Sequence, residues 1–158
     1  NFFNLPMSNF SPGASAQKPL EIEGHNLSTA ICYEVVYPDL VAKISRGSSM
    51  LLTVSNDAWF GDSLALPQHM QMAQMRALEN AKPMLRATNN GLTAFIDYQG
   101  YLTSTLPPFK EGALIGTIRP REGQTPFTIW GSWPCIVLCL ILVIILSQLK
   151  TSNNGTRG

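Results

Sequence analysis

The chain has 158 residues, a formal net charge of +1 at pH 7 and only 13% charged residues. This length is enough for one domain with an ordinary hydrophobic core. The near-neutral charge and the lack of a Lys/Arg run argue against nucleic acid as a partner, because nucleic-acid-binding domains carry a basic patch. The first residue is Asn rather than Met, so we expect the chain to be part of a longer protein.

The first predicted strand is the short apolar run over residues 27–34, which is rich in β-forming residues and follows a polar turn over 21–26. Cys32 lies near the end of this run, where rigid backbone would hold a nucleophile. The alternative is a small buried hydrophobe, since free Cys is among the most buried residue types. A reactive thiolate needs a nearby base or cation. His25 is rejected as that base, because seven extended residues separate it from Cys32 by ~20 Å.

The middle of the chain mixes predicted helices with predicted strands. A short helix begins at Tyr37-Pro38, with the proline in its first turn. A polar-aromatic loop over 56–61 contains Asn56 and Asp57, which we expect to cap the loop or the next helix. Further strands are predicted over residues 50–55, 85–88, 92–97, 101–106 and 113–118. Strands of mixed order with helices between them fit a layered α/β fold.

A strong helical pattern covers residues 68–81. Its apolar residues are expected to pack on the sheet rather than against lipid; they are Met72, Met75, Ala77, Leu78 and Ala81. Arg76 and Glu79 are three residues apart, and their spacing alone predicts an ordinary surface pair.

The C-terminal part is strongly apolar. No charged residue occurs from 123 to 149, and the mean hydropathy of the whole chain is +0.07. A bilayer core needs ~20 helical residues, and residues 129–149 supply about that number, with Trp130 and Trp133 where an interfacial aromatic belt would lie. We therefore predict a transmembrane helix over 129–149 rather than a buried core helix.

Two cations, Lys150 and Arg157, follow the predicted helix. By the positive-inside rule, residues 150–158 would be cytoplasmic and the globular part would lie on the far side. Cys135 and Cys139 share one face of the helix, but no His or carboxylate joins them, so we reject a metal site there. An unpaired Cys32 on the periplasmic side would need a reason, and nucleophilic catalysis is one.

Several motifs, taken in order, resemble the C-terminal half of the nitrilase (carbon–nitrogen hydrolase) superfamily, and within it the family of lipoprotein N-acyltransferases. The matching segments are 5–8 (LPMS), 31–34 (ICYE), 55–61 (SNDAWFG), 68–86, 88–91 (TNNG) and 131–134 (GSWP). The resemblance implies an α/β fold, namely the C-terminal half of a nitrilase-like αββα sandwich over residues 1–128. One C-terminal transmembrane helix would follow over 129–149, then a tail over 150–158, and neither a metal nor another cofactor is implied. It also implies that Arg76 or Glu79 belongs to a buried ion pair beside the active site.

The resemblance also implies a catalytic set. Cys32 would be the nucleophile, and the backbone N–H of Tyr33 would be one oxyanion donor. Glu34, on an extended backbone, would point to the same side as Cys32 and fix the Lys or the active-site loop rather than transfer a proton. Trp59 and Phe60 would form the wall of an acyl pocket, with core packing as the alternative. The Glu base and the Lys of the superfamily have no matching positions here, so we expect them upstream and expect the chain alone to be inactive.

The implied reaction moves a fatty acyl chain from a membrane phospholipid to Cys32, giving a thioester. The N-terminal amine of a diacylglyceryl-cysteine apolipoprotein would then accept the acyl chain. Two alternatives remain open: a membrane-tethered nitrilase-type amidase that hydrolyses a C–N bond, and a non-catalytic membrane-anchored binding domain. The implied location is the bacterial inner membrane, with the catalytic part periplasmic and the C-terminus cytoplasmic.

Overall fold

The structure is a computed structural model that describes residues 17–155, with side chains described as far as Gln148. The segment 5–8 and the residues 156–158 of the predicted tail lie outside this part. Six strands form one sheet, and they lie side by side in chain order. They are β1 (Leu20–Ile22), β2 (His25–Ile31), β3 (Met50–Ser55), β4 (Met84–Thr88), β5 (Thr93–Ile96) and β6 (Leu102–Leu106).

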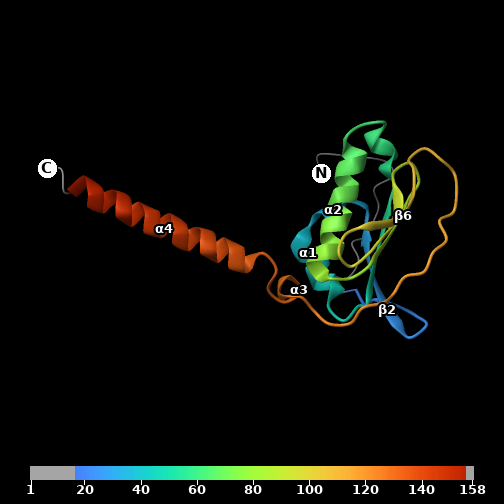
Figure 1. Ribbon diagram of the computed structural model, residues 1–158, viewed down its shortest axis with the longest axis horizontal. Helices are drawn as coiled ribbons and strands as arrows, with labels where there is room; N and C mark the ends of the chain where they lie inside the picture. The colour runs from blue at the N-terminus through green and yellow to red at the C-terminus, as the bar shows by residue number, and fades with distance from the viewer. Residues whose placement is uncertain (1–16, 156–158) are drawn as a thin grey trace, which may run out of the picture.

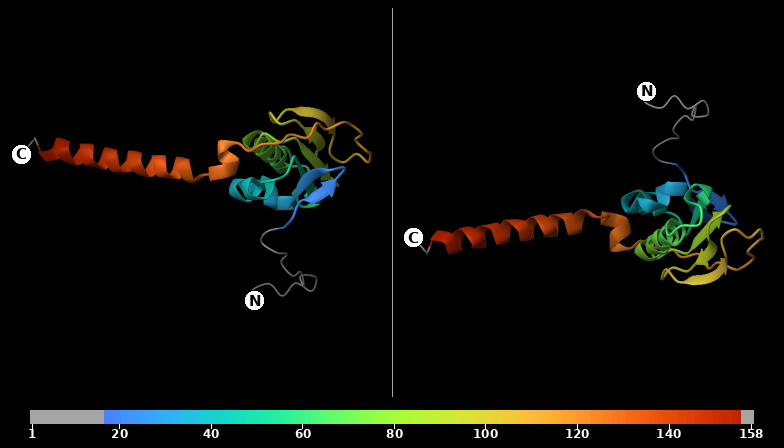
Figure 2. Two further views of the ribbon diagram at one scale, coloured as in Figure 1. Left: turned by 90° about the horizontal axis from the view of Figure 1, so that it is seen from below. Right: turned by 90° about the horizontal axis from the view of Figure 1, so that it is seen from above.

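The three central strands, β2, β3 and β4, are parallel, and the flanking strands are antiparallel to their neighbours. Helix α1 (Pro38–Ser45) connects β2 to β3, and helix α2 (Ala65–Asn80) connects β3 to β4. Both helices lie on the same face of the sheet (Figures 1 and 2). This is the arrangement that two successive crossovers of one hand produce.

The hydrophobic core lies between these helices and the sheet. Its members are Ala30, Leu51, Met84, Ala94 and Ile96 from the strands, with Val35, Val41, Met70, Ala73 and Ala77 from the helical side. Burial of each large apolar side chain contributes about 1.5–3 kcal/mol, so this layer holds the central strands firmly. On the opposite face, the side chains of Ile31 and Val54 are 58% and 38% exposed.

The carboxyl ends of the three parallel strands meet at one edge of the sheet. Ile31 pairs with Val54, and Ser55 pairs with Thr88. Cys32 and the loop after Ser55 therefore lie next to each other at this edge. In open α/β sheets, the carboxyl ends of parallel strands are where active sites form.

Most predicted elements are present, but several differ from the prediction. The strand predicted over 27–34 ends at Ile31, because the backbone turns at Cys32 into the 3₁₀ helix η1 (Cys32–Val36). The segment 113–118 forms no strand. The predicted core face of α2 is correct for Ala77, which is buried in the core, but wrong for Met72, Met75 and Leu78, which are 36%, 46% and 48% exposed. The buried face instead carries His69, Arg76 and Asn80 among its residues; these polar side chains disguised the periodicity.

The C-terminal helix predicted over 129–149 is interrupted. Helix α3 (Pro126–Trp130) ends at Gly131, whose φ is +61°, and α4 (Trp133–Gly155) begins afterwards. The carboxylate of Asp39 accepts hydrogen bonds from the backbone N–H of Ser132 at 2.8 Å and from its hydroxyl at 3.0 Å, which fixes the break.

Helix α4 projects away from the rest of the molecule (Figures 1 and 2). Its side chains from 133 to 148 are all exposed. Within residues 17–155, however, no helix combines the length and the apolar character needed to cross a membrane. The prediction of a transmembrane helix is therefore not supported by the described residues.

Candidate active site

Cys32 occupies a strained turn at the end of β2. Its φ is +53°, in the left-handed region that non-glycine residues rarely adopt. Such strain, of order 1–3 kcal/mol, concentrates at functional sites, and a strained strand-to-helix turn is a known way to present a nucleophile. The side chain is partly exposed. His25 begins β2, at the opposite end of the strand from Cys32.

The two neighbours of Cys32 do not adopt the geometry expected of an extended strand. Glu34 lies in η1, and its Oε2 accepts a hydrogen bond from the backbone N–H of Ile31 at 2.7 Å. The argument that alternation places Glu34 on the side of Cys32 is therefore wrong, although the carboxylate does fix the turn. The ring of Tyr33 is 55% exposed and packs edge-to-face with Tyr37 at 5.8 Å. The oxyanion role of its backbone N–H stays a prediction.

A chain of hydrogen bonds begins at the sulfur of Cys32 and runs into the protein. The hydroxyl of Ser55, the last residue of β3, lies 3.4 Å from the Sγ of Cys32. The same hydroxyl lies 2.5 Å from Oδ1 of Asp57. Asp57 is only 1% exposed, and its backbone N–H donates to Oδ1 of Asn89 at 3.1 Å.

Two buried basic residues, Arg86 and His69, complete this cluster. Nη2 of Arg86, from β4, lies 2.7 Å from Oδ2 of Asp57, and both side chains are fully buried. Nδ1 of His69, from α2, lies 3.2 Å from Oδ1 of Asp57 and 3.1 Å from Arg86 Nη2. The ring of Phe60 stands edge-on to that of His69, with ring centres 5.9 Å apart.

The protonation states of the cluster follow from its burial. Burial lowers the pKa of His69 below its ordinary 6.5, the Arg86 charge lowers it further, and Asp57 acts in the opposite direction. His69 is therefore neutral at pH 7. Burial also lowers the pKa of Arg86, against the raising effect of Asp57, but a guanidinium remains charged in proteins. The cluster thus holds one anion and one cation, paired out of water.

An open cleft of about 600 Å³ borders Cys32 at the carboxyl edge of the sheet. Its lining residues are Ile31, Cys32, Val54, Ser55, Asn56, Trp59, Ala87, Thr88 and Asn89. The side chain of Trp59 is 87% exposed, so its indole is free to contact a bound molecule. Phe60 does not line this cleft and packs against His69 instead. The two aromatic residues predicted as pocket walls therefore occupy different positions.

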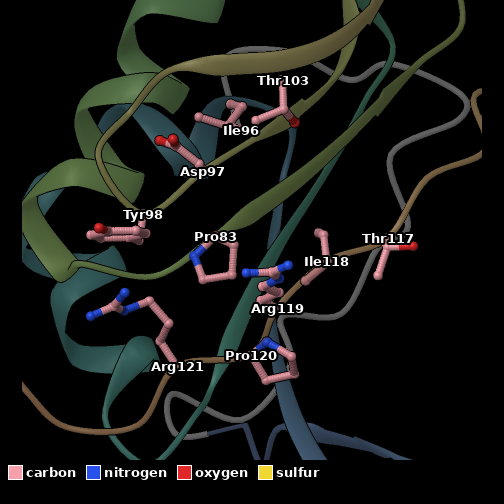
Figure 3. Close-up of a pocket in the computed structure, with 10 residues that line it drawn as sticks. All are labelled: Pro83, Ile96, Asp97, Tyr98, Thr103, Thr117, Ile118, Arg119, Pro120 and Arg121. Atoms are coloured by element: carbon pink, nitrogen blue, oxygen red, sulfur yellow. The ribbon is translucent and has the colours of Figure 1, made fainter.

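A second hollow, of about 460 Å³, lies elsewhere, at the start of β4 (Figure 3). It is lined by Pro83, Ile96, Asp97, Tyr98, Thr103, Thr117, Ile118, Arg119, Pro120 and Arg121. The guanidinium of Arg121 lies 3.7 Å from the centre of the Tyr98 ring. Because this hollow adjoins the amino end of β4 and Cys32 adjoins the carboxyl end of β2, it is not part of the nucleophile's site.

Some residues of the candidate site were missed or misjudged at the level of sequence. Asn56 caps the loop as expected, since its Oδ1 accepts from the N–H of Ala58 at 3.1 Å. Asp57, assigned the same plain role, is instead the centre of the buried cluster. His69 and Arg86 were not singled out. Arg86 lies beside Thr53 because β3 pairs in parallel with β4, a register that the sequence pattern does not supply.

The pair Arg76–Glu79 also departs from the surface interpretation. Nη2 of Arg76 donates to Oε1 of Glu79 at 2.8 Å, and the side chains are 9% and 19% exposed. Burial raises the pKa of Glu79, while Arg76 lowers it. The ion pair implied by the resemblance is therefore present but only partly buried, and it fixes α2 to η1 because Nη1 of Arg76 also donates to the carbonyl of Val36 at 3.2 Å.

The fold and the cysteine at the strand end define the class of this protein. A family model described as carbon–nitrogen hydrolase matches residues 5–126. The chain therefore belongs to the carbon–nitrogen hydrolase family.

Within the family, the chain is similar to proteins named apolipoprotein N-acyltransferase. It is 51% identical over 142 residues to that of Pseudomonas syringae pv. tomato, covering 90% of this chain and 28% of the relative. It is 50% identical over 133 residues to that of Photobacterium profundum, covering 84% of this chain and 26% of the relative. The chain thus spans little more than a quarter of the length of these relatives.

Solved structures share the fold at low sequence identity. An amidase from Nesterenkonia sp. AN1 superimposes with a TM-score of 0.51 at 24% identity, over 63% of this chain and 41% of the other. A carbon–nitrogen hydrolase from Helicobacter pylori gives a TM-score of 0.53 at 14% identity, over 62% of this chain and 42% of the other. The amidase carries acrylamide, added at its active-site cysteine.

Proposed function

We propose that this chain is the cysteine-bearing part of an N-acyltransferase that matures lipoproteins. In this proposal Cys32 takes a fatty acyl chain from a membrane phospholipid and passes it to the N-terminal amine of a diacylglyceryl-cysteine apolipoprotein. The observation that carries the proposal is the position of Cys32 on a strained turn beside an open cleft, in a chain about half identical to proteins named for this activity.

The chemistry has two balanced halves. The Cys32 thiolate attacks the ester carbonyl of the phospholipid, a C–S bond forms, the C–O bond breaks, and the alcohol oxygen of the lysophospholipid leaves with the proton taken from the thiol. The acceptor amine then attacks the thioester carbon, the amide C–N bond forms and the C–S bond breaks, and the proton lost by the amine returns the leaving sulfur to the thiol. In each half a base must carry the proton from the attacking group to the leaving group. We assign it, with a Lys for the oxyanion, to parts of the protein outside this chain.

The apolar surface supports a lipid substrate. The cleft beside Cys32 is lined by Ile31, Val54 and Trp59, which are exposed and apolar. The exposed side chains of α4 from Ile136 to Leu146 are apolar as well. Large exposed apolar surfaces mark protein, ligand or membrane contacts. We therefore propose that the protein lies at the bacterial inner membrane.

The alternative function is amide hydrolysis, with water as the second nucleophile. It is favoured by the likeness to an amidase, which shares the fold. A nitrilase-type cysteine can transfer an acyl group to an amine or to water, because exclusion of water decides the outcome. The amine is preferred here because the sequence similarity to acyltransferases is far higher than to the amidase.

The test uses the complete natural protein in detergent micelles, mixed with phospholipid alone. Mass spectrometry of proteolytic peptides is expected to show an acyl adduct on Cys32, and Cys32→Ala is expected to lack it. Cys135→Ala is the matched control and should keep the adduct. An adduct found only on Cys135 or Cys139 contradicts the assignment.

A second measurement separates transferase from hydrolase. The isolated acyl-enzyme is incubated in buffer with and without a synthetic diacylated lipopeptide. Discharge that requires the lipopeptide and produces an N-acylated peptide supports the transferase. Equally fast discharge in buffer alone, with release of free fatty acid, identifies a hydrolase.

A further inference from the structure

We propose that Ser55 is a further catalytic residue, whose hydroxyl donates a hydrogen bond to the Cys32 thiolate. While Cys32 is a thiol, the hydroxyl donates to Asp57 instead, which keeps it beside the sulfur. The proposal deepens the proposed function and rests on Cys32 being the nucleophile. It concerns a hydrogen bond only, so Ser55 exchanges no proton with the substrate.

The geometry places Ser55 between the reacting sulfur and a fixed carboxylate. Its Oγ is 3.4 Å from Cys32 Sγ and 2.5 Å from Asp57 Oδ1. Ser55 is the last residue of β3 and pairs in register with Thr88, so its backbone is held by the sheet. The hydroxyl therefore needs only to rotate about its C–O bond to change its acceptor.

The carboxylate of Asp57 keeps its partners when Ser55 turns away. Arg86 Nη2 donates to Oδ2 at 2.7 Å. This ion pair does not involve Ser55, and both of its side chains are fully buried. The buried carboxylate therefore keeps its counter-charge when the Ser55 hydroxyl turns to the sulfur, so no buried charge is left unpaired.

A matching need arises at the sulfur. Negative charge appears on Cys32 when the thiol loses its proton, and again when the thioester breaks and sulfur leaves. A donor that is already in place stabilises this charge without reorganisation. Ser55 is the residue of this cluster whose hydrogen bond reaches Cys32 Sγ directly.

The experiment measures the rate at which iodoacetamide alkylates Cys32 in the complete natural protein, as a function of pH. Quantitative mass spectrometry of the Cys32 peptide reports the rate. A hydrogen bond to a charged group contributes enough to move a titration by about one pH unit. In Ser55→Ala the pH midpoint is expected about one unit higher, with alkylation at pH 7 slowed roughly tenfold. Ser55→Thr, which keeps a hydroxyl, is expected to restore the profile.

Thr88→Val is the matched control, because Thr88 lines the same cleft but its hydroxyl contacts Thr93 rather than Cys32. It should leave the alkylation profile unchanged. An unchanged midpoint in Ser55→Ala overturns the proposal. So does a lower midpoint, because it would mean that the hydroxyl accepts a hydrogen bond from the thiol and stabilises the protonated form.

Alkylation needs no phospholipid or lipopeptide, so this test is independent of the acyl-transfer assays. If the Ser55 effect is measured but no acyl adduct forms, the hydrogen-bond proposal stands and the proposed acyltransferase function fails. If the adduct forms without the Ser55 effect, the proposed function stands and the hydrogen-bond proposal fails.

Discussion

Nη2 of Arg86 lies 2.7 Å from Oδ2 of Asp57, and neither side chain is accessible to solvent. The pair joins β4 to the loop after β3, immediately behind the nucleophile. Removal of one partner from a buried ion pair leaves a charge without compensation, which costs about 3–5 kcal/mol. The ion pair is therefore both a structural element and the support of the candidate site.

The first prediction concerns this pair. Asp57→Asn is expected to lower the free energy of unfolding by about 3–5 kcal/mol, because Arg86 stays buried without its counter-charge. Chemical denaturation of the complete natural protein, followed by tryptophan fluorescence, measures the change. Asp62→Asn, at an exposed position in the same loop region, should stay within about 0.5 kcal/mol of the wild type. Similar losses in the two variants would contradict the role of the ion pair.

The second prediction concerns Gly91, which closes the turn over Asp57. A Cβ at this position would lie 2.1 Å from Oδ2 of Asp57 and 2.8 Å from its Cγ. Gly91→Ala is expected to destabilise the protein by about 1–3 kcal/mol, as overpacking does. Thermal unfolding reports the effect. Gly112→Ala is the control, since its Cβ would meet only the terminal methyl groups of Leu106 at 3.2 Å or more.

The third prediction is a pH dependence that arises from His69. Its pKa is lowered in the folded protein, chiefly by burial and then by Arg86. As the pH falls through 6.5, the ordinary pKa of histidine, the unfolded state therefore binds more protons than the folded state. The stability of the folded protein falls with the pH for this reason. The fall in Tm between pH 7.5 and 5.5 should be smaller in His69→Gln than in the wild type.

His25→Gln provides the comparison for that measurement, because His25 is exposed at the start of β2. It should retain the full fall in Tm. The pKa of Glu79 is raised from 4.5, so its protonation acts in the opposite sense, but this contribution is common to the wild type and both variants. An equal fall in Tm for His69→Gln and the wild type would show that His69 is not the group responsible.

The fourth prediction concerns activity. The 158-residue chain on its own is expected to show no acyl transfer from phospholipid to a diacylated lipopeptide, because loss of a base from a nucleophilic set leaves only residual catalysis. The complete natural protein, assayed in parallel, is the positive control. Turnover by the isolated chain at the rate of the complete protein would show that the proposed base and Lys are not required.

The elements that depend on local pattern could be predicted from the sequence. The hairpin before Cys32, the helix that begins at Pro38 and the buried strand over 50–55 follow from turn residues, a proline at the first helical position and β-branched content. The family could also be identified, because its motifs occur in the right order along the chain. Cys32 stood out for the same reason, as a thiol within such a motif.

Tertiary structure alone decided what surrounds that thiol. In the sequence, Asp57 is 12 residues from His69 and 29 from Arg86, and His69 is 17 residues from Arg86. Only the parallel register of β3 with β4 and the crossover through α2 bring the three side chains together. Because each is buried by its partners, none shows the apolar periodicity by which sequence reveals a core. The left-handed backbone of Cys32 was hidden likewise, since a strained conformation is imposed by surrounding packing against the local preference of the residue.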